Sequence, residues 1–212
     1  MTSVPKLFPG ETVAILAGGP SLTQADVDAC RGRVRVIAIK DAIRLAPWAD
    51  VLYSGEIRWW RHYGDSLQFA GLRYGIEATS PPPAFPAGLG PWGVTVLRNT
   101  GPVGLETDPS GLRTGKNSGF QAVNLARHLG AKTILLLGFD MQPSEQGQTH
   151  WFGAHPYTMA DSPYREFLEC WPTIVEPLRQ EGVEVLNCTP TSALKVFQMM
   201  SVADALTRGV AA

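Results

Sequence analysis

The sequence has little cysteine, no excess of charge of one sign and no long hydrophobic run. Its three cysteines, Cys30, Cys170 and Cys188, are odd in number and widely spaced, which argues against a disulfide framework and predicts reduced thiols in a cytoplasm. The 18 Lys and Arg residues nearly balance the 19 Asp and Glu residues, so there is no strong nucleic-acid signature. No apolar run approaches the length of a transmembrane segment, and the N-terminus lacks the basic and apolar regions of a signal peptide.

The composition is that of a globular chain, with 44% hydrophobic and 17% charged residues, and we expect one domain over residues 1–212. Runs rich in Val, Ile and Leu, with little alternation, predict strands buried on both faces of a parallel sheet at residues 12–17, 34–39, 50–54, 74–78, 94–98, 132–138 and 183–187. Helices are predicted between them, at residues 23–30, 41–46, 58–69, 118–129, 163–181 and 192–207. This order predicts a single-domain, Rossmann-like, doubly wound α/β fold with a mainly parallel sheet of about seven strands.

Three stretches, near residues 80–93, 101–116 and 142–162, are predicted to be irregular loops. Loops of this length in a compact domain are usually functional or disordered. Doubly wound folds bind their ligands beyond the carboxyl ends of the strands. Polar residues stand at several of these predicted ends, and Lys40, Ser54 and Asp140 are candidates for the site.

The segment TVAILAGGPSL, residues 12–22, predicts a strand, a glycine turn and the start of a helix. Such a corner can bind an anion, because backbone N–H groups point outward and the helix dipole favours negative charge. Its residues Gly18, Gly19, Pro20 and Ser21 are therefore candidates for phosphate binding. It is neither a full G-x-G-x-x-G nor a G-x-x-x-x-G-K-[ST] motif, and a tight turn in any α/β protein is the alternative interpretation.

A second possible anion site lies at residues 114–119, which read TGKNSG and precede an amphipathic helical pattern. Asn117 or Ser118 can cap this helix, and Gly119 allows close approach of a ligand. Lys116 supplies a cation beside the helix start. An ordinary capped helix after a loop is the alternative.

The strand-end carboxylate of Asp140 follows the buried run KTILLLGF. It can bind a ribose hydroxyl, a metal or a basic side chain, or it can cap the following turn. Both interpretations stay open from the sequence.

His150 and His155 enclose the hexapeptide HWFGAH in the third loop. Imidazole is the side chain best suited to accept a proton near neutral pH, so each is a candidate general base. A solvent-exposed loop histidine is the alternative, and the surrounding acidic residues make no recognisable metal-ligand pattern.

The segment EIRWW follows the predicted strand at residues 50–54 and offers candidates for recognising an acceptor. Glu56 and Arg58 can pair or hydrogen-bond, and Trp59 and Trp60 can stack on a sugar or a base. The alternative is a tryptophan pair that fills the core.

Taken in order, these motifs resemble the bacterial sialyltransferases of glycosyltransferase family 42. The likeness covers residues 13–197 and rests on AGGPSL, TGKNSGFQAVNLARHLGAKTILLLGFDM, HWFGAH and LNCTPTSAL. The wider superfamily with this fold includes archaeal hydroxymethyldihydropterin pyrophosphokinase and uncharacterised phage and prophage proteins. Through PWADVLYSGEIRWW and NSGFQAVNLARHLGA, the chain is most similar to the phage members.

The resemblance implies an enzyme that uses a nucleotide-sugar donor, of CMP type, without a metal ion. His155 matches the general base of the family, and His150 matches the first histidine of the same loop. The implied nucleotide-binding residues are Gly18, Gly19, Pro20, Ser21, Asn117, Ser118 and Gly119, with Asp140 nearby. The chain departs from the family at Gly19, Lys40 and Ser54, where the sialyltransferases have Asn.

Two other functions stay open from the sequence. A pyrophosphokinase-like phosphotransferase needs Mg²⁺ near the phosphates, with Glu56 and Asp140 as candidate carboxylates. A non-catalytic nucleotide-binding phage protein keeps the glycine turns and needs no base. We expect the cytoplasm, or the host cytoplasm for a phage protein; the acceptor and a homo-oligomeric state stay open.

Overall fold

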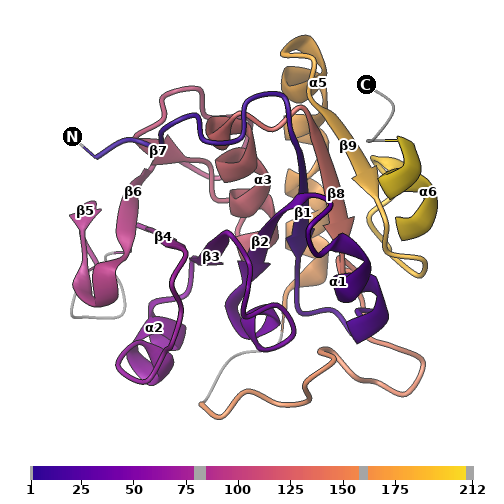
Figure 1. Cartoon of the computed structure of the whole chain (residues 1–212), viewed down its shortest axis with the longest axis horizontal. Helices are drawn as coiled ribbons and strands as arrows, with labels where there is room; N and C mark the ends of the chain where they lie inside the picture. The colour runs from indigo at the N-terminus through magenta and orange to yellow at the C-terminus, as the bar shows by residue number, and fades with distance from the viewer. Residues whose placement is uncertain (1, 79–84, 158–161, 209–212) are drawn as a thin grey trace.

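The computed structural model describes residues 2–78, 85–157 and 162–208, and its centre is one mixed, mostly parallel sheet. The strand order is β10-β9-β8-β1-β2-β3-β4-β6-β5, with β7 paired to β6 (Figure 1). The strands of the described chain are β1 (Thr12–Leu16), β2 (Arg35–Ile39), β3 (Val51–Ser54), β4 (Leu72–Ile76), β5 (Gly88–Leu89), β6 (Thr95–Asn99), β7 (Gly111–Leu112), β8 (Thr133–Leu137), β9 (Glu184–Asn187) and β10 (Gln198–Met199). Between the strands of the described chain, all pairings are parallel except that of β5 with β6.

The helices connect these strands and cover both faces of the sheet (Figure 1). They are α1 (Gln24–Cys30), the 3₁₀-helix η1 (Lys40–Arg44), α2 (Ile57–Tyr63), the 3₁₀-helix η2 (Pro91–Gly93), α3 (Ser118–Leu129), α4 (Tyr164–Cys170), α5 (Pro172–Gln180) and α6 (Val202–Arg208). From β1 the chain adds strands in one direction as far as β6. It then passes through α3 to β8, on the other side of β1.

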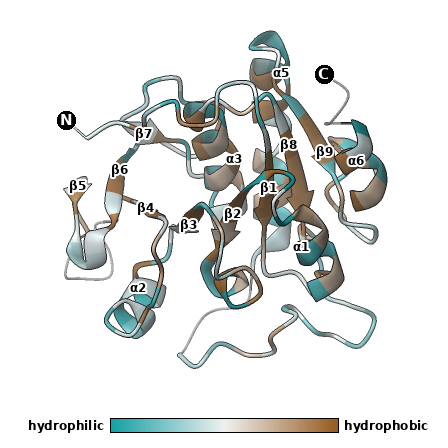
Figure 2. Ribbon diagram, in the orientation of Figure 1, coloured by the Kyte–Doolittle hydropathy of each residue, from teal (hydrophilic) through white to brown (hydrophobic). Residues whose placement is uncertain are grey.

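The alternate residues of β1 explain why the predicted strands show no polar face. Val13 and Ile15 pack into one apolar cluster with α3 and α5, whereas Ala14 and Leu16 pack into a second cluster with α1, α2 and α6. All four side chains are fully buried. Figure 2 shows the same arrangement as hydrophobic strands between helices whose outer sides are more hydrophilic.

The seven predicted strands are all present, with ends within two residues of the prediction. The count of about seven was nevertheless too low, because β5, β7 and β10 add two residues each to the sheet. The strands β5 and β7 lie in segments predicted to be irregular, and residues 80–84 and 158–161 of the predicted loops lie outside the described chain.

Four predicted helices differ from those observed. The helix expected at residues 163–181 is divided into α4 and α5 at Trp171, because Pro172 has no N–H to continue the hydrogen-bond ladder. The predicted helix at residues 58–69 ends at Tyr63, and that at 41–46 is the 3₁₀-helix η1. The predicted helix at residues 192–207 begins only at Val202, because Gln198 and Met199, within the predicted range, pair with β9 as the strand β10.

Candidate functional site

A pocket of about 130 Å³ lies at the carboxyl ends of β1, β2 and β8. The strand order changes direction between β1 and β8, which is the position where open α/β sheets bind ligands. Residues 17–19, 39–41 and 138–141 line it from the strand ends, and residues 117–119 line it from the first turn of α3. In Figure 1 these ends point toward the long loop that follows β8.

The glycine turn after β1 is shaped by contacts within the protein. A Cβ atom on Gly19 would lie 2.0 Å from Asp140 Oδ2 and 2.4 Å from the Gly138 carbonyl oxygen. Gly19 therefore allows the turn to approach β8, which differs from the expected role of admitting a phosphate. Gly18 lines the pocket and faces the histidine loop, whereas Pro20 is not among the lining residues.

The helix α1 begins close to its predicted start, beyond Ser21, the last residue of the predicted anion corner. Thr23 caps this helix by accepting a hydrogen bond from the Asp26 N–H, at 3.2 Å. The helix has seven residues and begins at Gln24. The anion-binding potential of this end of the pocket therefore rests on the backbone of the glycine turn.

Asp140 joins the glycine turn to the segment after β9. Its Oδ2 accepts from the Ser21 hydroxyl at 2.9 Å, and its Oδ1 accepts from the Thr191 hydroxyl at 3.1 Å. Its carbonyl oxygen accepts from the Ala193 N–H at 2.7 Å. Among the described residues, the carboxylate accepts no hydrogen bond from the turn that follows it, so the expected capping role is not observed, and hydroxyl groups of two other segments hold the carboxylate instead. The partner Thr191 was not predicted, although it lies in the LNCTPTSAL motif.

The first turn of α3 is the second wall of the pocket. Asn117 caps the helix by accepting from the Phe120 N–H at 2.9 Å, as predicted, and the Ser118 hydroxyl accepts from the Gly55 N–H at 3.3 Å. Gly119 packs on Phe139, where a Cβ atom would lie 2.6 Å from Cε1. In the described part of the chain, the N–H groups of Ser118 and Gly119 have no acceptor, which is usual for a first helical turn.

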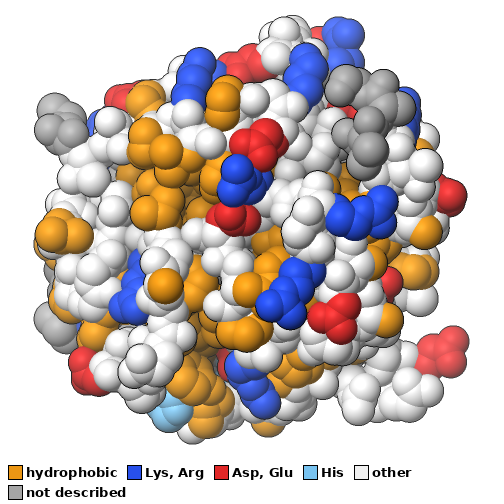
Figure 3. All heavy atoms as spheres, viewed as in Figure 1, with side chains coloured by type: hydrophobic (Ala, Val, Ile, Leu, Met, Phe, Trp, Pro, Cys, Tyr) orange, Lys and Arg blue, Asp and Glu red, His pale blue; other side chains and the backbone are white. Residues whose placement is uncertain are grey.

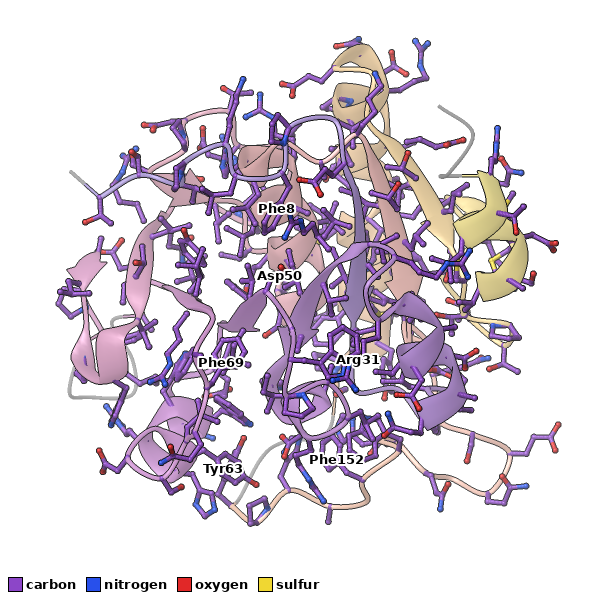
Figure 4. All side chains as sticks on the ribbon, in the orientation of Figure 1. Phe8, Arg31, Asp50, Tyr63, Phe69 and Phe152 are labelled. Atoms are coloured by element: carbon purple, nitrogen blue, oxygen red, sulfur yellow. The ribbon has the colours of Figure 1, made fainter. Side chains whose placement is uncertain are left out.

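The loop after β8 places both candidate histidines against the pocket. The Trp151 N–H donates to the Gly18 carbonyl at 3.2 Å, which fixes the loop over the glycine turn. The His150 and His155 ring centroids are 4.8 Å apart, and Phe152 stacks on His150 at 4.9 Å. Figure 4 shows Phe152 below the ends of the central strands.

The surroundings of both imidazoles lower their pKa values and so favour the uncharged form. Burial, followed by the charges of Lys40 and His150, lowers the pKa of His155 to about 4. Burial and then Lys40 also lower the pKa of His150. Three buried ring nitrogens, His150 Nδ1 and both nitrogens of His155, have no hydrogen-bond partner among the described residues.

Two lysines predicted to bind the nucleotide lie in different surroundings. Lys40 lines the pocket, and burial lowers the pKa of its ammonium group while the charges of Glu56 and Asp41 act in the opposite direction. Lys116 does not line the pocket. Its Nζ pairs with Glu166 Oε2 on α4 at 2.6 Å.

The residues predicted to recognise an acceptor have mainly structural contacts. Trp59 and Trp60 are fully buried, so neither ring offers a face for stacking on a sugar. Trp59 Nε1 donates to Asp41 Oδ2, and Trp60 Nε1 donates to the Ser54 carbonyl, both at 3.0 Å.

The remaining residues of this segment lie around the start of α2 and are not among the pocket-lining residues. Glu56 caps α2 by accepting from the Arg58 N–H at 3.2 Å, and Arg58 is exposed. The Ser54 hydroxyl accepts from the Glu56 N–H at 3.1 Å, so it closes the turn that precedes the helix.

Several lining residues were not predicted from the sequence. They are apolar or aromatic side chains from the loop after β8 and from α4, and they include Met141, Phe152, Tyr164 and Phe167. The positions of this loop and of α4 at the strand ends make them part of the pocket, and no local sequence signal identifies them.

Comparison with known proteins finds no matching protein family, no matching curated protein and no matching solved structure. Among the described residues, no helix is both long and apolar enough to cross a membrane. The same residues contain no group of three or more His, Cys, Asp or Glu side chains placed to hold a metal ion. The geometry of the pocket therefore carries the functional argument.

Proposed function

We propose that this protein is a glycosyltransferase-like enzyme with a Rossmann-like fold, and that it takes a nucleotide-sugar donor of CMP type. The position of the pocket, at the reversal of strand order, supports a nucleotide ligand. The free N–H groups at the start of α3 support an anionic one. The resemblance to family 42 supplies the reaction class.

The observation that carries the proposal is the histidine pair at the pocket. An imidazole can accept a proton only when it is uncharged and has a free ring nitrogen, and His155 meets both conditions. His150 lies beside it and is a candidate for the same role.

In the proposed reaction, a ring nitrogen of His155 takes the proton of the acceptor hydroxyl as that oxygen bonds to the anomeric carbon of the donor sugar. The bond between the anomeric carbon and the phosphate oxygen breaks, and the nucleotide leaves with the electron pair. The N–H groups of Ser118 and Gly119 stabilise the charge that develops on the phosphate.

The pyrophosphokinase alternative has weaker support from the geometry. Both carboxylate oxygens of Asp140 accept hydrogen bonds from protein hydroxyls, and Glu56 does not line the pocket. The two carboxylates proposed to hold Mg²⁺ are therefore not presented together at this site.

The test is turnover of CMP-sugar, UDP-sugar and GDP-sugar donors by wild type, His155→Ala, His150→Ala and the double variant. We expect His155→Ala to lower turnover by about a hundredfold or more, with nucleotide affinity nearly unchanged, because a general base acts in the transition state. Loss of activity only in His150→Ala would assign the base to His150. Full turnover in the double variant would refute histidine base catalysis, and nucleotide binding without turnover would favour a binding protein.

A further inference from the structure

Lys40 is the one basic side chain, other than the histidines, among the described residues that line the pocket, and the carboxylates whose charges act on it, Glu56 and Asp41, make no ion pair with it. Asp41 and Asp140, the acidic lining residues, are both engaged elsewhere. Asp41 accepts from the Trp59 indole and lies 3.8 Å from Arg44, while Asp140 accepts from Ser21 and Thr191. Within the described chain, the Lys40 ammonium has neither a hydrogen bond nor an ion pair.

The backbone of Lys40 is also unusual for a lysine. Its φ of 52° lies in the left-handed region, where a residue with a Cβ atom is disfavoured by about 1–2 kcal/mol. Lys116 has a similar φ of 59°, but its side chain pairs with Glu166 outside the pocket. The two lysines have similar φ angles but different surroundings, so a substitution of Lys116 provides a control for the same substitution of Lys40.

The hydrogen-bond donors around Lys40 limit the chemistry of the ligand. The N–H groups of Ser118 and Gly119, the Lys40 ammonium, and an imidazole N–H of His155 all belong to the residues lining one pocket. A phosphate has three or more oxygen atoms and up to two negative charges, so it can accept from this number of donors. A carboxylate has two oxygens and one charge.

We propose that Lys40 is the anion-recognising residue of this pocket and that the group it binds is a phosphate or diphosphate, which also contacts the start of α3. This inference rests on the proposed function, because it names the chemical class that the same site recognises. It also assigns the role to a residue at which the chain departs from the sialyltransferase pattern.

The test is calorimetric titration of the metal-free protein with inorganic pyrophosphate and with CMP, using acetate as a carboxylate control. We expect Lys40→Met to raise the Kd of both phosphate probes by about tenfold or more, and Lys40→Arg to keep it within about threefold. Lys116→Met, the matched control, is expected to leave the Kd unchanged. Lys40→Gly suits the left-handed backbone, and so provides a variant without the cation that is expected to fold.

The possible outcomes separate this inference from the proposed function. Lys40-dependent binding of pyrophosphate or CMP without turnover of any nucleotide sugar would support Lys40 and count against the glycosyltransferase. Turnover that Lys40→Met and Lys40→Gly leave unchanged would refute the role of Lys40. Failure of wild type to bind either probe, a loss confined to Lys116→Met, or acetate binding as tight as that of pyrophosphate would also overturn it.

Discussion

At Gly19, neighbouring atoms of the protein itself limit the size of the side chain. We expect Gly19→Ala to lower the free energy of unfolding by about 3 kcal/mol, because its methyl group would overlap Asp140 Oδ2 and the Gly138 carbonyl. Gly18→Ala is the matched control, since its Cβ atom would meet His150 and Phe152 at an ordinary 3.4 Å. Urea unfolding of the two variants measures the difference. Equal stability would show that the turn and Asp140 move apart easily.

Residue types in the sequence identified the candidate site only in part. The motifs located Gly18, Asn117 and the two histidines, all of which line the pocket. They did not reveal that Asp140 is held by hydroxyl groups, because Thr191 is distant in sequence and joins it only through the fold. A tryptophan pair is equally compatible with a stacking surface and with a core, and only tertiary packing decides that Trp59 and Trp60 are buried.

At the scale of elements, two long loops differ in how they are attached. The segment between β6 and α3 is anchored by the buried Asn124 side chain, whose Oδ1 accepts from the N–H groups of Glu106 and Arg113. Between Gln142 and Tyr157, the loop after β8 has one backbone hydrogen bond to the strand ends among the described residues, from Trp151 to Gly18. The described residues have seven buried side-chain polar atoms without a hydrogen-bond partner, and five of these lie in this loop, on His150, Trp151, His155 and Tyr157.

This contrast predicts that the loop after β8 opens locally and closes over ligand. Hydrogen exchange should be fast at the Trp151 amide and slow at the Glu106 and Arg113 amides, because a single backbone hydrogen bond to the strand ends opposes opening of the described part of the loop after β8. Added CMP should slow exchange at Trp151 and leave the other two amides unchanged. Strong and equal protection of Trp151 with and without CMP would contradict a lid.

The elements themselves were predictable to different degrees. The long buried strands carry their own signal, because strands covered on both faces need continuous Val, Ile and Leu. The two-residue strands β5, β7 and β10 have no local pattern of this kind and exist only through their neighbours. Pro172, by contrast, marks in the sequence the break between α4 and α5, so this error could have been avoided.

The whole molecule has a mixed surface. On the face shown in Figure 3, Lys and Arg side chains are interspersed with Asp and Glu among uncharged residues. This agrees with the net charge of −1. Electrostatic effects on stability are therefore expected to come from a few buried groups rather than from the overall charge.

Three of those buried groups are histidines, and they predict how stability depends on pH in mild acid. Burial lowers the pKa of His128, His150 and His155 in the folded state. The unfolded chain, with ordinary histidine pKa values of about 6.5, then binds more protons as the pH falls. The contribution of the uncharged histidines to the free energy of unfolding is therefore complete above about pH 6.5. It is lost as the pH falls toward the folded-state pKa of His155, about 4.

Between pH 7 and pH 5, we expect His155 to account for a loss of about 1–2 kcal/mol in the free energy of unfolding, allowing for its partial exposure. Carboxylates with lowered pKa values, such as Glu106 and Asp108, weaken the fold in acid too, but they do so below their ordinary pKa values of 4.5 and 3.8. The change in stability between pH 7 and pH 5 therefore comes mainly from the histidines.

Urea unfolding across this interval is the measurement, and His155→Gln should weaken the dependence of stability on pH because glutamine does not titrate. A wild-type stability that stays constant from pH 7 to pH 5 would show that His155 takes up its proton in the folded protein, through opening of the loop.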